Sequence, residues 1–151
     1  MRMLVLGAGL QGSACAYDLL QNPDVTEVRL ADLNVSHLPE FLHAYSGKRL
    51  IPTLLDVRDH EAVLAVMRES KATMSAIPYY FNLDLARPAV KAASNFCDLG
   101  GNPELVSKQK DPHPAARTAT ATAAPHRGAA SGPGDAHATD GRGPPPSTPS
   151  A

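Results

Sequence analysis

The stretch Met3-Leu-Val-Leu-Gly7-Ala-Gly9-Leu-Gln-Gly12 decides the fold, because an apolar run passes directly into a G-x-G-x-x-G pattern. A second apolar run ends at Asp32, twenty positions after Gly12. The order strand, glycine loop, helix, strand and acidic residue is typical of a dinucleotide-binding unit. The alternative is an ordinary glycine-rich turn followed by an unrelated aspartate, and it explains fewer of these features.

Each glycine of the loop has a separate expected role. Gly7 permits the tight turn out of the first strand, Gly9 lets the backbone approach a pyrophosphate, and Gly12 lets the helix pack close to the strand. The helix that starts near Leu10 offers unpaired amides and the positive end of its dipole to the phosphates. The residues that we predict to bind the cofactor here are Gly7, Ala8, Gly9, Leu10, Gln11 and Gly12.

Asp32 is expected to accept hydrogen bonds from the adenosine ribose hydroxyls. Its carboxylate would repel a 2′-phosphate by up to about 4 kcal/mol at about 4 Å and an effective dielectric constant near 20. No Arg or Lys follows Asp32 immediately. The sequence therefore favours NAD over NADP, and NADP stays open if a nearby cation compensates.

Composition excludes several classes of protein. The chain has 151 residues and a formal net charge of −1, which suits one folded domain. The basic residues form no stripe that would bind nucleic acid, and no apolar run approaches the roughly 20 residues that span a bilayer. Cys15 and Cys97 have neither the number of a disulfide framework nor the spacing of a metal site. We therefore expect a cytoplasmic protein without a metal site and without a nucleic-acid or membrane partner.

Apolar segments with strand and helix periods alternate along the first part of the chain. This alternation predicts a doubly wound α/β fold, Rossmann-like, with five parallel strands in the order 3-2-1-4-5. Pro52 fits a strand start or an edge, and Pro88 requires a kink or a late start of its helix. With no sixth strand expected, the fifth would be an exposed edge. The predicted strands cover residues 2–6, 26–31, 50–55, 72–77 and 95–99, and the predicted helices cover 11–21, a segment capped by Ser36, 60–69 and 82–94.

Ligands of such sheets bind at the carboxyl ends of the strands, where the strand order reverses between the first and fourth strands. Asp56 and Val57 follow the third strand and are expected to flank the adenine. A helix cap or a turn residue is the alternative role for Asp56. The segment at the end of the fourth strand is expected near the ribose and nicotinamide, and it comprises Ser75, Ala76, Ile77 and Pro78.

The composition changes abruptly near Lys110. Residues 111–151 contain only eight residue types and no Val, Leu, Ile, Met, Phe or Tyr. Such a segment cannot bury enough apolar surface to offset the entropy of ordering, so we predict a disordered tail over 110–151 and a folded domain over 1–109. Two origins stay open: a natural Pro- and Ala-rich tail, or a frameshift near codons 108–112.

Several segments together resemble the saccharopine dehydrogenase-like oxidoreductases, and lysine 6-dehydrogenase-type members most of all. The resemblance covers residues 1 to about 109. It implies an NAD(P)-dependent enzyme of lysine metabolism, in which a hydride passes between the nicotinamide and the carbon of an amino acid's C–N bond. The family's substrate domain is expected to be absent, which would make this chain an inactive fragment on its own. The matching segments are Val5-Leu-Gly-Ala-Gly-Leu-Gln-Gly12, Leu55-Asp-Val57, Ala76-Ile-Pro78 with Phe81-Asn82, and Asp98-Leu-Gly-Gly-Asn102.

The catalytic residue stays unknown. Amine oxidation needs a proton acceptor, and Tyr79, Tyr80 and Asp98 lie at the expected strand ends. The tyrosines could equally be walls of the cleft, and Asp98 could fix its loop through the amides of Gly100 and Gly101. Three functions remain: the cofactor domain of an amino-acid dehydrogenase, an NAD-binding regulatory module, or a non-functional fragment. The expected partner is a small amino-acid substrate, and a homodimer is the one assembly that we consider.

Overall fold

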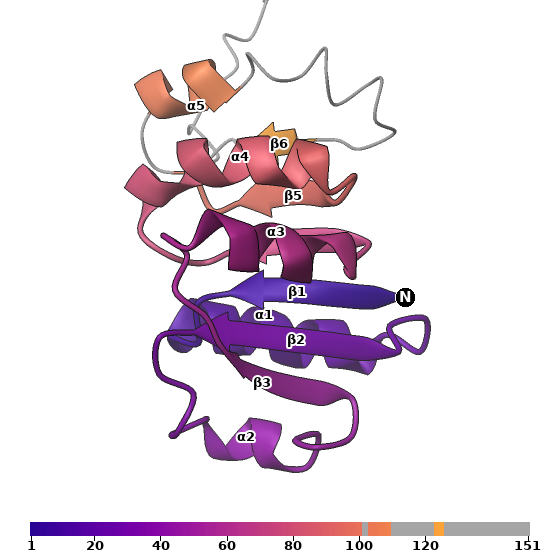
Figure 1. Cartoon of the computed structure of the whole chain (residues 1–151). Coiled ribbons are helices and arrows are strands. Elements are labelled where there is room, and N and C mark those ends of the chain that lie inside the picture. Colours follow the sequence, from indigo (N-terminus) through magenta and orange to yellow (C-terminus); the bar gives the residue numbers. More distant parts are fainter. Residues whose placement is uncertain (101–102, 110–122, 126–151) are drawn as a thin grey trace, which may run out of the picture.

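The computed structural model describes residues 1–100, 103–109 and 123–125. Its centre is a parallel sheet in the order β3-β2-β1-β4-β5-β6 (Figure 1). The strands are β1 (Arg2–Leu6), β2 (Glu27–Asp32), β3 (Leu50–Leu54), β4 (Ala72–Ser75), β5 (Asn95–Asp98) and β6 (Ala123–Pro125). The helices are α1 (Leu10–Gln21), α2 (Glu40–His43), α3 (His60–Arg68), α4 (Asn82–Lys91) and α5 (Pro103–Gln109), with a 3₁₀ turn η1 (Tyr79–Phe81).

The order of the first five strands confirms the predicted doubly wound fold. Every neighbouring pair among them is parallel, and β1 lies between β2 and β4. The strand order therefore reverses between β1 and β4, which places the expected ligand crevice at the carboxyl ends of these two strands.

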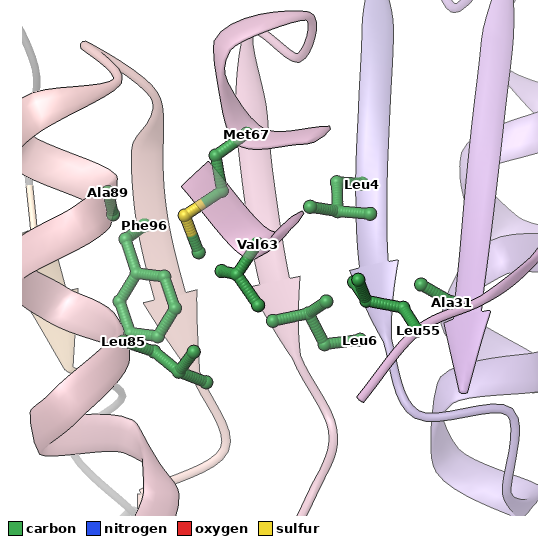
Figure 2. Packing of buried hydrophobic residues seen from close by; sticks show 9 residues of the cluster. All are labelled: Leu4, Leu6, Ala31, Leu55, Val63, Met67, Leu85, Ala89 and Phe96. Atoms are coloured by element: carbon green, nitrogen blue, oxygen red, sulfur yellow. The ribbon is translucent and has the colours of Figure 1, made fainter. Parts of the chain in front are cut away.

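The strand β1 is buried on both faces, as its continuous apolar run predicts. Successive side chains of a strand point to opposite faces. Leu4 and Leu6 pack with α3 and α4 on one face, whereas Val5 packs with α1 and α2 on the other. Figure 2 shows the first of these clusters, and Figure 1 shows α1 on the opposite side of the sheet from α3. Packing on both faces holds β1 in place at the point where it passes into the glycine loop.

The two edges of the sheet differ from each other. Pro52 lies in β3, which stands at one end of the described strand order beside β2, so the predicted edge position for this proline is confirmed. At the other edge, the expectation that no sixth strand exists is wrong, because β6 pairs in parallel with β5. The stretch Ala-Ala-Pro has no apolar run that would signal a strand. The rest of the predicted tail, 110–122 and 126–151, lies outside the described residues.

Two helices differ from expectation, α2 in its length and α4 in the position of its proline. The helix predicted from Ser36 is limited to α2, because Asn34 and Ser36 donate their backbone N–H groups to the side chains of Asp32 and Asn34. Such local bonds compete with helix formation. Pro88 lies inside α4 rather than at a late helix start. Within the described part of the chain, no helix combines the length and hydrophobicity that a bilayer span requires.

Candidate functional site

The glycine loop is fixed by close contacts within the protein. Gly7 has a φ of +98°, and its N–H donates to the carbonyl of Ala31 at 2.7 Å. A Cβ at Gly7 would lie 2.9 Å from the carbonyl oxygen of Ala76. A Cβ at Gly12 would lie 1.8 Å from the carbonyl oxygen of Gly7. The fold itself therefore requires glycine at both positions.

Gly9 is different, because the protein leaves the space around it open. A Cβ at Gly9 would meet no heavy atom within 4 Å, and its φ of −67° suits any residue. The residue stands at the N-cap of α1, where no side chain caps the helix. Leu10, which follows, is 82% exposed. The first amides of a helix lack partners within the helix, so this position offers free N–H groups and room for an anion.

The Asp32 carboxylate lies against this loop. Its Oδ2 accepts a hydrogen bond from the N–H of Ala8 at 2.7 Å, and its Oδ1 accepts one from the N–H of Asn34 at 3.1 Å. Two backbone amides thus hold one carboxylate at the end of β2. An ionised carboxylate has about four acceptor positions, so it can still accept hydrogen bonds from the hydroxyl groups of a ligand.

A cavity of about 400 Å³ opens beside Asp32 at the carboxyl ends of β2, β3 and β4. Five predicted site residues line it: Asp32, Asp56, Val57, Ile77 and Pro78. No residue of the glycine loop, from Gly7 to Gly12, is among the lining residues, but Ala8 is hydrogen-bonded to Asp32, which is. Ala76 does not line it but lies behind the loop, against Gly7 and Gly12. The other lining residues are Ala31, Leu33, Leu55, Arg58, Tyr80 and Phe81.

Arg58 is the charged lining residue that the sequence did not predict. Its Nε lies 3.0 Å from both carboxylate oxygens of Asp56, and its Nη2 lies 2.6 Å from Oδ2. These bonds, with that from the backbone N–H of Arg58, lower the pKa of Asp56 to about 2. The Asp-x-Arg spacing was the available signal. That pair lies far along the chain from Asp32, so a cation in it does not stand out as a neighbour of Asp32.

The candidate proton acceptors are distributed unevenly. Tyr80 lines the cavity, and its ring meets that of Tyr79 edge to face with centroids 5.7 Å apart. Asp98 is 1% exposed, and its Oδ1 accepts the N–H of Gly100 at 2.6 Å. That contact is the loop-fixing role considered for Asp98. Gly101 and Asn102 lie outside the described residues.

A buried side-chain pair supports the wall formed by the β4–α4 connection. The hydroxyl of Ser75 donates to Oδ1 of Asn82 at 2.7 Å, and both side chains are buried. The pair joins the end of β4 to the start of α4 and so holds Ile77 and Pro78 at the cavity. Among the described residues, no group of three or more His, Cys, Asp or Glu could hold a metal ion.

The family model described as the saccharopine dehydrogenase NADP binding domain matches residues 3–124. The match extends past the change of composition near Lys110.

Solved structures show the same fold. Saccharopine dehydrogenase (L-Glu forming) from Saccharomyces cerevisiae is 23% identical with a TM-score of 0.64, and the match covers 82% of this chain and 26% of that one. A protein from Sinorhizobium meliloti provisionally described as a myo-inositol dehydrogenase is 19% identical with a TM-score of 0.61. That match covers 83% of this chain and 36% of that one. The dTDP-glucose 4,6-dehydratase of Bacillus anthracis, in complex with NAD, is 16% identical with a TM-score of 0.53. That match covers 66% of this chain and 37% of that one. The matches therefore cover between 26% and 37% of the length of these proteins.

Proposed function

The chain belongs to the saccharopine dehydrogenase NADP-binding domain family, and we propose that it is the cofactor-binding part of an oxidoreductase acting on the carbon–nitrogen bond of an amino acid. One observation carries the proposal. The Asp32 carboxylate is held by the N–H of Ala8, directly beside the open space at Gly9. An acceptor for ribose hydroxyls and a cradle for a pyrophosphate are thus adjacent.

Each part of the site has a role in holding the dinucleotide. The amides at Gly9 and the start of α1 receive the pyrophosphate, and Asp32 accepts the ribose hydroxyls. Asp56, Val57, Ile77 and Pro78 all line the cavity. In this proposal Asp56 and Val57 flank the adenine, and Ile77 and Pro78 face the ribose and nicotinamide. The bound cofactor supplies hydride transfer, and the chain's residues orient it and exclude water from one face.

The proposal includes NAD as the preferred cofactor and a cytoplasmic location. The preference rests on Asp32, whose carboxylate opposes a 2′-phosphate. The ionisable side chains among the described cavity-lining residues are Asp32, Asp56, Arg58 and Tyr80, and none of them is assigned as a proton acceptor. We expect the 151-residue chain, whose match covers 26% of saccharopine dehydrogenase (L-Glu forming), to bind cofactor without turning over an amino acid by itself.

Titration of the 151-residue chain with NADH, followed by nicotinamide fluorescence, tests the binding. Gly9→Ala places a methyl group in the phosphate space, so NADH affinity should fall by at least about tenfold with little change in stability. Gly47→Ala is the matched control. It adds a methyl in open space away from the cavity at a φ of +71°, and should lower stability by about 1 kcal/mol without changing NADH affinity.

The outcomes separate the three functions. A folded chain that binds neither NADH nor NADPH contradicts the proposal, and a chain that does not fold supports the non-functional fragment. Binding with no turnover of lysine, saccharopine or related amines, even when the remaining domain of a family member is supplied, supports the regulatory module. Turnover restored by that domain supports the dehydrogenase.

A further inference from the structure

The cavity is lined by more negative than positive side chains, and the charged groups are held by different contacts. Asp32, Asp56 and Arg58 line it, and Arg58 is the only cation among its described lining residues. Two carboxylates and one guanidinium leave one negative charge. A ligand with an added phosphate therefore enters a cavity that is already negative.

Asp32 cannot relieve this repulsion by moving. Both of its oxygens accept backbone N–H groups, from Ala8 and Asn34. Turning the carboxylate away would leave those amides without their partner, which carries a free-energy penalty. The negative charge beside the ribose is thus a fixed property of the loop.

Arg58 does not compensate for Asp32, because it is already engaged. Its guanidinium contacts both oxygens of Asp56, with distances of 2.6–3.0 Å. The pair is solvent-accessible, with side chains 71% and 34% exposed for Arg58 and Asp56. A phosphate that took the guanidinium from Asp56 would exchange one charge-assisted contact for another. It would also leave Asp56 as a second uncompensated carboxylate in the cavity.

We propose that Asp56 is a specificity-determining residue that keeps the cavity's cation paired and so disfavours a cofactor bearing a 2′-phosphate. This inference rests on the proposed function, since it presumes that a dinucleotide occupies the cavity. It places NAD preference on two features, the fixed carboxylate of Asp32 and the Asp56–Arg58 pair. Removing the charge of Asp56 frees Arg58 and brings the net charge of the cavity from negative to neutral.

The test compares the dissociation constants of NADH and NADPH for the 151-residue chain and its variants. The unmodified chain should bind NADH more tightly. Asp56→Asn keeps an oxygen that can accept the N–H of Arg58 but loses the charge, so NADPH affinity should rise about tenfold relative to NADH. The double variant Asp56→Asn with Arg58→Gln should lose that gain. The gain should also shrink at high salt, because exposed charges are screened.

Glu61→Gln is the matched control, since it makes the same charge change nearby on α3 without lining the cavity. It should leave the ratio of the two affinities unchanged. An unmodified chain that prefers NADPH overturns the inference, as does an Asp56→Asn variant with an unchanged ratio while NADH still binds. If neither nucleotide binds the folded unmodified chain, the proposed function fails, and the inference fails with it.

Discussion

The glycine loop, which contacts the cavity residue Asp32, and the β3–α3 loop, which lines the same cavity, are held in different ways. Backbone atoms fix the glycine loop: Gly12 packs on the carbonyl of Gly7, and an amide holds Asp32. In the β3–α3 loop, the exposed side chains of Asp56 and Arg58 hold each other, in addition to one bond to the backbone. Gly7 and Gly12 can change only if the fold changes, whereas the Asp56–Arg58 pair can change by single substitutions.

This difference suggests a division of labour. The part that receives the common pyrophosphate is built into the fold, and the part that distinguishes one cofactor from another is exchangeable. Substitutions in the two loops should therefore differ in which property they change. Three variants test this contrast, beginning with the largest expected effect.

Gly12→Ala should be the most disruptive substitution. A Cβ there would lie 1.8 Å from a backbone oxygen, so α1 must shift away from β1. We expect the free energy of unfolding in urea to fall by about 3 kcal/mol, or folding to fail. Gly9→Ala is the control, and its unfolding midpoint should stay close to that of the unmodified chain. Equal midpoints for both variants would show that backbone packing does not fix the loop.

Ser75→Ala tests whether a buried side-chain hydrogen bond contributes to the stability of the fold, unlike the solvent-accessible Asp56–Arg58 pair. The substitution leaves Oδ1 of the buried Asn82 without its donor. The free energy of unfolding should fall by about 1–2 kcal/mol. Ser36→Ala, on an exposed residue, is the control and should have little effect. A negligible effect of Ser75→Ala would place the β4–α4 wall with the exchangeable region instead.

The smallest effect concerns pH. Because Arg58 lowers the pKa of Asp56 to about 2, below the ordinary value near 3.9, the pair stabilises the folded state above about pH 4. That stabilisation is lost as the pH falls through 4 toward 2, and it is small because both groups are exposed. NMR titration of the Asp56 carboxyl should give a midpoint near 2, and Arg58→Gln should raise it toward the ordinary value. An unchanged midpoint would mean that the pair does not form in solution.

The sequence was sufficient for the parts that local patterns encode. The apolar run of β1 and the alternation of segments predicted the order of five strands, and the structure confirms it. The spacing from Gly12 to Asp32 predicted a carboxylate beside the loop, and the two are joined by the Ala8–Asp32 bond. Whether these residues bind a cofactor stays a prediction.

The rest depended on contacts that the period of apolar residues does not show. The strand β6 forms because β5 offers an unpaired edge, not because Ala-Ala-Pro favours a strand. The helix at Ser36 is shortened by side-chain bonds that compete with helical ones. Arg58 lies at the cavity of Asp32 because β3 lies beside β2, as the predicted sheet order implies, but its side-chain contact with Asp56 is a feature that the strand and helix pattern does not encode.

The strand β6 also bears on solubility. It covers one side of β5, and its last residue, Pro125, has no N–H to offer. A strand of three residues that ends in proline presents too few donors to recruit a strand from another molecule. Growth of intermolecular β-structure from this side is thereby discouraged.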